Sequence, residues 1–225
     1  HLDPLLQIQR ALMALVWNQP EMAQCFLSQA LLDLPDSPTA LLVSAALLRS
    51  RGDLERALDA AMASLERDPR YLPALVQAAE LFWGTDREAQ ARELMELALE
   101  VRPWSSQAFI LRGFMHLSKG DAVKATEDLK RALASDPSSS EAHLGLGILG
   151  MREGRREEAL EEFLTASLVE PMASLPLSYL GKALHDLGRS REGLAVLERA
   201  AELDPLDPTP HLYRGLILRD LHRPG

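Results

Sequence analysis

Small and hydrophobic residues recur along the chain at helical spacing, in short segments that polar turns separate. On one helical face of residues 106–118, positions i, i+3, i+4 and i+7 are Phe109, Arg112, Gly113 and His116. A polar turn, Lys119-Gly120-Asp121, interrupts this segment. The face of the next segment consists of Ala125, Leu129, Ala132 and Leu133. That segment ends at Asp136-Pro137, because proline lacks an N–H and restrains the residue before it. The pattern predicts two antiparallel helices joined by a tight turn.

A period of 34 residues organises the chain. It is marked by six prolines at equal spacing, Pro35, Pro69, Pro103, Pro137, Pro171 and Pro205. With each proline at position 32 of a repeat, the repeats are 4–37, 38–71, 72–105, 106–139, 140–173 and 174–207, with a partial seventh at 208–225. We expect a single domain over residues 1–225. Because the seventh repeat stops after one helix, we also expect this chain to be part of a longer protein.

The columns of this register alternate small and large side chains. Position 8 is Ala11, Ala45, Ala79, Gly113, Gly147, Gly181 and Gly215. Position 20 is Ala23, Ala57, Ala91, Ala125, Ala159 and Gly193. Position 24 is mostly large, with Leu27, Ala61, Met95, Leu129, Phe163 and Leu197. Small residues let two helix axes approach, and the large side chain fills the space beside them. A lone helix pair cannot bury such a face, so stacked pairs forming a solenoid are predicted.

The turn between the two helices of a repeat falls at position 15. Four repeats have glycine there, namely Gly52, Gly120, Gly154 and Gly188, and glycine readily adopts the positive φ that closes a helix hairpin. The first repeat has Asn18-Gln19-Pro20 at its turn, and it fits the pattern least well.

These columns resemble the tetratricopeptide repeat. The likeness rests on the period and on small residues at positions 8, 20 and 27 with proline at 32, as in Gly113, Ala125, Ala132 and Pro137. It extends over nearly the whole chain. The resemblance implies an all-α fold, a right-handed superhelix of antiparallel helix pairs whose first helices line a concave groove. It also implies a role in binding protein segments.

By this resemblance, positions 2, 5, 9 and 12 of each first helix face the groove, and we call them the groove positions. We expect position 5 to be partly covered by the neighbouring repeat and positions 9 and 12 to remain exposed. The apolar residues at 9 and 12 would then form a continuous strip, and exposed apolar surface of that extent marks a binding site. The predicted partner-binding residues are Leu12, Trp83, Ile110, Phe114, Leu117, Leu144, Ile148, Met151 and Lys182. Position 6 has no asparagine in any repeat, which disfavours recognition of an acidic C-terminal tail.

Charge and composition narrow the range of partners. The net charge is -9 with 24 Lys and Arg against 33 Asp and Glu, and no basic stripe is present to neutralise phosphates, so a nucleic-acid partner is excluded. The longest apolar stretch, residues 40–48, is about half the length of a membrane span. Cys25 is alone and cannot form an internal disulfide, which leaves the cytosol and the periplasm both open. The preference for Arg over Lys is typical of a GC-rich bacterial genome.

The sequence offers little sign of chemistry. We interpret His116, His143 and His211 as packing residues, and no histidine pair has the spacing of a zinc site. No glycine belongs to a phosphate-binding loop, and Ser138-Ser139-Ser140 reads as a turn and helix cap. We interpret the acidic run at 157–162 as a solvated face partly neutralised by nearby arginines, and other Arg and Asp pairs as surface charges. No catalytic residue, cofactor or metal is therefore predicted.

The sequence predicts a non-catalytic scaffold that binds an apolar or amphipathic segment of a protein partner in its groove. One alternative is the arm of a larger enzyme or of a secretion or assembly complex, which presents substrate or regulates it. Another is self-association, through the groove or through the exposed ends of the repeat array.

Overall fold

The computed structural model describes residues 3–221, and every regular element in that range is an α-helix. The helices are α1 (Pro4–Val16), α2 (Pro20–Asp33), α3 (Pro38–Ser50), α4 (Leu54–Arg67), α5 (Leu72–Gly84), α6 (Glu88–Val101), α7 (Ser106–Ser118), α8 (Ala122–Ser135), α9 (Ser140–Arg152), α10 (Arg156–Val169), α11 (Ser174–Asp186), α12 (Ser190–Leu203) and α13 (Pro208–Leu221). The end of the predicted seventh repeat, at 222–225, lies outside the described residues.

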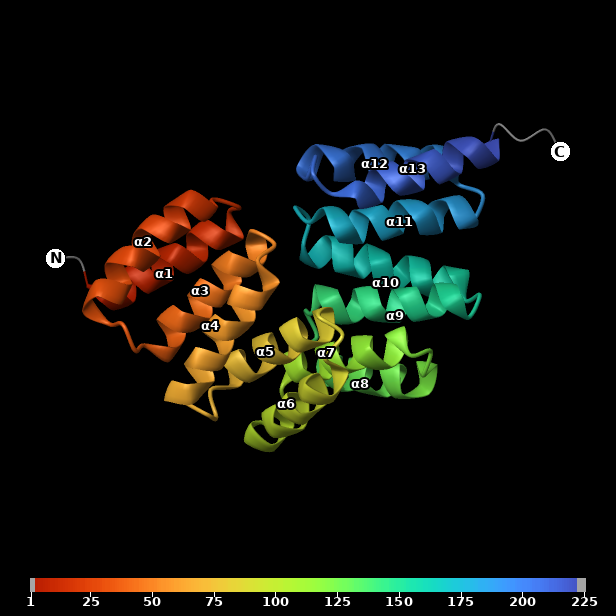
Figure 1. Cartoon of the computed structure of the whole chain (residues 1–225). Coiled ribbons are helices and arrows are strands. Elements are labelled where there is room, and N and C mark those ends of the chain that lie inside the picture. The colour runs from red at the N-terminus through yellow and green to blue at the C-terminus, as the bar shows by residue number, and fades with distance from the viewer. Residues whose placement is uncertain (1–2, 222–225) are drawn as a thin grey trace. The chain divides into compact units, whose positions relative to one another are not determined.

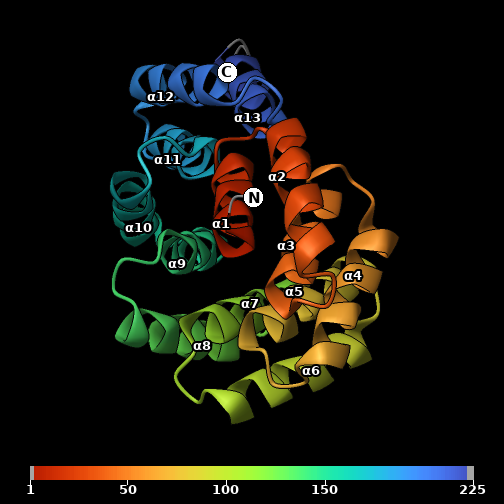
Figure 2. The same cartoon turned by 90° about the vertical axis from the view of Figure 1, so that its left-hand side faces the viewer.

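The contacts divide the chain into two compact units, His1–Leu111 and Arg112–Gly225. In the first unit α1 packs against α2, α3 against α4, and α5 against α6, as three antiparallel pairs (Figure 1, Figure 2). In the second unit the pair of α9 and α10 is followed by the pair of α11 and α12 and then by α13, in successive layers (Figure 1). The prediction of a single domain over 1–225 stays a prediction.

The helix bounds follow the 34-residue register. Each odd-numbered helix begins at position 1 of its repeat, and each even-numbered helix from α2 to α12 ends two residues before the proline at position 32. Side chains cap several starts, since the oxygens of Ser37, Asp53 and Ser139 accept from backbone N–H groups in the first turn. The interpretation of the serine cluster at 138–140 as a turn and cap is thus confirmed.

Asp207 holds the start of α13. Its carboxylate accepts from the Thr209 N–H at 2.8 Å and from the Ser174 hydroxyl at 2.8 Å. Partial burial opposes ionisation of Asp207, but these hydrogen bonds outweigh it and lower the pKa of the carboxyl below its ordinary value.

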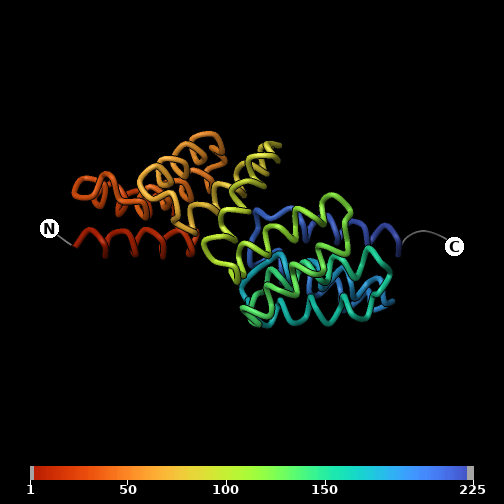
Figure 3. Tube along the Cα trace, turned by 90° about the horizontal axis from the view of Figure 1, so that it is seen from below, coloured from red at the N-terminus to blue at the C-terminus, as the bar shows by residue number. Residues whose placement is uncertain are grey.

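The turn column behaves as the sequence predicts and extends to two further residues. The four glycines at position 15 have φ between 76° and 80°. Asn18 and Asp86 occupy the same position in the first and third repeats, with φ of 53° and 59°. Asn and Asp tolerate the left-handed region better than other non-glycine residues, so all six hairpins share one turn geometry, visible as the short links of the trace in Figure 3.

The small and large columns form the core of each repeat. A Cβ atom placed on Gly147 would lie 2.5 Å from the ring of Phe163, and one on Gly113 would lie 2.9 Å from Leu129. The alternation predicted from the sequence is therefore a direct contact between positions 8 and 24. Gly215 differs, because no heavy atom lies within 4 Å of its Cβ position.

No helix among residues 3–221 has the length and apolar character needed to cross a membrane.

Candidate functional site

The groove positions of the second unit lie on α9, α11 and α13, with Phe114 and Leu117 on the part of α7 that belongs to this unit. Phe114, Ile148 and Met151 are half-buried, so part of each side chain remains accessible. Ile148 and Met151 pack on the edge of the core cluster that contains Phe163. Leu175 at position 2 and Leu212 at position 5 add two exposed leucines.

Three of the predicted groove residues are buried. Leu144 belongs to a core cluster with Leu180 and Leu184 of the next repeat, as expected for a covered position 5. Ile110, in the first unit, is buried as well. Leu117 contradicts the prediction, because it sits at position 12 and is nevertheless buried. Its carbonyl accepts a 2.7 Å hydrogen bond from Arg152 Nη1, which ties the arginine side chain to the end of α7.

Lys182 does not present a free charge to the groove. Its ammonium donates to both carboxylate oxygens of Asp186, one turn later on α11, at 2.5 and 2.6 Å. His185, also on α11, has Nδ1 2.9 Å from the Ser190 hydroxyl and Nε2 3.6 Å from Asp220. These polar side chains are engaged with one another, and the apolar residues remain the accessible part of this groove.

An aromatic ladder, which the sequence analysis did not identify, stands beside these residues. The rings of Phe163 and Tyr179 stack with centroids 5.3 Å apart, and Tyr213 meets Tyr179 edge-on at 5.6 Å. Burial, together with the nearby Tyr179 and Asp186, raises the pKa of Tyr213 above its ordinary value. Both tyrosines occupy position 6, and an aromatic residue repeated at that position is the sequence signal that marks the ladder.

The groove positions of the first unit are interrupted by charge. Arg49 on α3 donates to Glu80 on α5 at 2.7 Å, and these two residues occupy groove positions 12 and 9. The ion pair shares this surface with the exposed Leu12 of α1 and the half-buried Trp83 of α5. The predicted continuous apolar strip is therefore wrong for the first unit.

Ion pairs of this kind have a signal in the sequence. Arg51 pairs with Glu21, Arg67 with Asp36 and Arg87 with Glu55, all between neighbouring repeats of the first unit. Opposite charges separated by 30 to 32 residues, slightly less than one repeat, would have predicted them.

A buried ion pair also corrects the interpretation of Arg and Asp pairs as surface charges. Arg112 donates to both oxygens of Asp128, at 2.8 Å from Nε and 2.6 Å from Nη2, and Asp128 is buried. His116 Nε2 lies 3.7 Å from the same carboxylate. This cluster joins α7 to α8 within one repeat.

The other histidines and the acidic run also differ in part from the sequence interpretation. His143 Nδ1 lies 2.6 Å from Glu162 Oε2, so this histidine makes a polar contact, and His211 is exposed rather than packed. Arg155 pairs with Glu158, but Arg156 donates to the carbonyl of Asp186. Within residues 3–221 no three His, Cys, Asp or Glu side chains gather as a metal site would require.

Comparisons with known proteins agree with this architecture. Residues 116–175 and 180–224 each match a family model described as tetratricopeptide repeat. A comparison with curated proteins finds no match.

Solved structures share the fold at low sequence identity. The APC/C hetero-tetramer Cut9–Hcn1 contains a chain that is 20% identical with a TM-score of 0.77, over 88% of this chain and 40% of that one. This chain thus spans well under half of that relative. The structure from the functional characterization of Pseudomonas aeruginosa pilF is 17% identical with a TM-score of 0.68, over 96% and 97% of the two chains. YrrB, described as a TPR protein with an unusual peptide-binding site, is 21% identical with a TM-score of 0.51, over 84% and 97%.

With the paired helices and their 34-residue period, these matches show that the chain is a tetratricopeptide-repeat protein, an all-α solenoid whose fold implies a protein-interaction scaffold.

Proposed function

We propose that the chain is a non-catalytic scaffold that binds an apolar or amphipathic segment of a partner protein on the groove positions of its second unit. The observation that carries the proposal is the set of accessible apolar side chains there, Phe114, Ile148, Met151, Leu175 and Leu212. The nearby charges of Lys182 and Asp186 are already paired with each other, so burying the apolar side chains would not strand a charge. A segment that covers these residues gains about 25 cal/mol for each Å² of apolar surface removed from water.

The second unit supports this role better than the first. In the first unit a partner lying over the groove positions would cover the Arg49–Glu80 pair, whose side chains are both exposed. Covering a solvated ion pair carries a desolvation cost that apolar side chains do not have. The relative YrrB, which has the same fold, is described as having a peptide-binding site.

The test begins with a defined probe. A displayed peptide library is selected on the immobilised chain, and the best peptide is synthesised with a fluorescent label. Its affinity is measured by fluorescence anisotropy for the wild type and for Ile148→Glu. A groove residue at the centre of an interface contributes about 2 kcal/mol or more, so we expect a loss of affinity of roughly 30-fold.

The matched control is Leu168→Glu. Leu168 belongs to the same repeat as Ile148 and is an exposed leucine on α10, away from the groove positions. We expect the control to bind the peptide as the wild type does, and circular dichroism to show the same helical content for all three proteins. Equal affinity of the wild type and Ile148→Glu would refute the proposed site.

A further inference from the structure

The repeat register shows which face of each first helix is covered by the preceding repeat. Ala40 and Leu47, at positions 3 and 10 of the second repeat, belong to one core cluster with Ala11, Leu27 and Ala30 of the first repeat. At position 10, the later first helices carry Leu47, Leu81, Met115, Leu149, Ala183 and Ile217, all of them at most 5% exposed. At position 3, Ala40, Ala74, Ala108 and Ala142 are fully buried. Positions 3 and 10 therefore form the contact surface between one repeat and the repeat before it.

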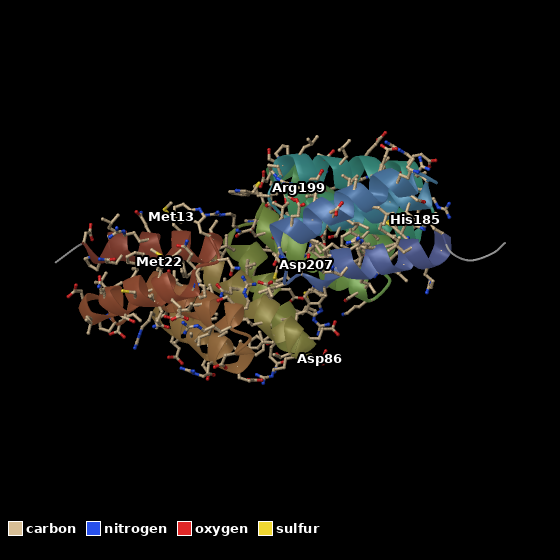
Figure 4. The ribbon with its side chains drawn as sticks, turned by 90° about the horizontal axis from the view of Figure 1, so that it is seen from above. Met13, Met22, Asp86, His185, Arg199 and Asp207 are labelled. Carbon is tan, nitrogen blue, oxygen red and sulfur yellow. The ribbon has the colours of Figure 1, made fainter. Side chains whose placement is uncertain are left out.

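The same positions on α1 are apolar and uncovered. Leu6 at position 3 is 43% exposed, and Met13 at position 10 is 51% exposed. Trp17, just beyond α1, is 63% exposed. We call these three residues the α1 face. Figure 4 labels Met13 on this helix, and Met22 on α2 is a further exposed methionine of the same helix pair.

The last described helix has an uncovered face of the complementary kind. In the fourth to sixth repeats, the glycine at position 8 is in contact with a large side chain from position 24. Gly215 at position 8 of α13 has nothing within 4 Å of its Cβ position, and Leu212 and Leu218 are exposed on either side of it. We call these three residues the α13 face. It combines an open space at a glycine with apolar side chains around it.

We infer that the α13 face of one copy of the chain binds the α1 face of a second copy, as a continuation of the contact between neighbouring repeats. Within the chain, first helices of neighbouring repeats already touch in this order, α1 with α3 and α11 with α13. Leu6 is larger than the alanines at position 3 of the second to fifth repeats, and the open space at Gly215 can accept the larger side chain. The contact joins two different faces, so it is heterologous and lets copies add to one another. This inference does not depend on the groove.

The experiment uses the full chain and two disrupted variants. The α1-face variant is Leu6→Glu with Met13→Glu, and the α13-face variant is Leu212→Glu with Leu218→Glu. Molar mass is measured by size-exclusion chromatography with light scattering over a range of concentrations. We expect the wild type to exceed the monomer mass as concentration rises, and each variant alone to remain a monomer.

Mixing the two variants distinguishes this contact from any other self-association. Each variant retains the face that the other has lost, so the mixture should form a dimer and stop there. Val123→Glu is the control, because Val123 is a highly exposed apolar residue at the start of α8, outside both faces, and it should associate as the wild type does. A wild type that is monomeric at every concentration would overturn the inference. So would a mixture that stays monomeric, or a variant that associates like the wild type. Circular dichroism of each variant confirms that these positions, exposed in the chain, tolerate the change.

Discussion

The contact between position 8 and position 24 makes a sharp prediction about Gly147. Replacing glycine by alanine inside an exposed helix normally stabilises a protein by about 1 kcal/mol, since glycine loses more backbone entropy on folding. At Gly147, however, the new Cβ atom would lie 2.5, 2.7 and 2.9 Å from three ring atoms of Phe163, which is fully buried. Overpacking of this kind costs about 1–3 kcal/mol. We therefore expect Gly147→Ala to lower the free energy of unfolding by about 0–2 kcal/mol.

Gly215→Ala is the matched control, because it is the same change at the same repeat position. Gly215 lies in α13 with no atom near its Cβ position, so only the entropic gain remains and the variant should be more stable by up to about 1 kcal/mol. The two variants are compared by urea unfolding followed by circular dichroism, and we expect unfolding midpoints shifted in opposite directions. Gly147→Ala as stable as Gly215→Ala would refute the close approach of Gly147 and Phe163.

A second-site change tests the mechanism of the loss. The first repeat already combines alanine at position 8 with leucine at position 24, in Ala11 and Leu27. The double variant Gly147→Ala with Phe163→Leu copies that pair into the fifth repeat. We expect it to recover stability relative to the sum of the two single changes, with a coupling of about 0.5–3 kcal/mol. Strict additivity would place the strain elsewhere.

Three further predictions follow from the buried pair, the turn column and the cap of α13. Asp128→Asn should lower the free energy of unfolding by about 1.5–3 kcal/mol, because it weakens a charged hydrogen bond with Arg112 in a buried site, whereas Glu127→Gln in the exposed pair beside it should cost under about 1 kcal/mol; urea midpoints compare the two, and equal losses would contradict the role of burial. Asn18→Ala should cost about 1–2 kcal/mol and Asn18→Gly nothing, since only alanine resists the left-handed φ, and thermal melts in which both variants match would rule this out. The lowered pKa of Asp207 gives stability that is present above its unfolded value of 3.8 and is lost as the pH falls through the folded pKa, so Asp207→Asn should be less stable than the wild type at neutral pH, with a difference that shrinks on acidification; a difference independent of pH, in the same melts, would contradict it.

The helices and turns of this chain were predictable because their causes are local. Proline at position 32 restrains the residue before it, and glycine at position 15 supplies a positive φ, whatever the rest of the chain does. Asp86 was missed because aspartate is not a general signal for that conformation, and only the register identifies it as the equivalent of the glycines.

The candidate site was less predictable because exposure depends on neighbouring repeats. Leu117 is buried although its position is open elsewhere in the repeats, and a hydrogen bond to its carbonyl comes from Arg152, 35 residues later. The Arg49–Glu80 pair likewise depends on two repeats lying side by side. Interactions of this kind differ from one repeat to the next, so a shared register does not reveal them.

The central claim, that the apolar groove positions of the second unit bind a partner segment, is tested most directly by methyl NMR. The labelled chain is titrated with the selected peptide, and the methyl shifts of Ile148 and Met151 are followed beside those of Leu168 and Val123, which are exposed outside the groove positions. Our account predicts saturable shifts at Ile148 and Met151, with Leu168 and Val123 unchanged. Shifts confined to Leu168 or Val123, with the groove methyl groups unmoved by a bound peptide, would contradict it.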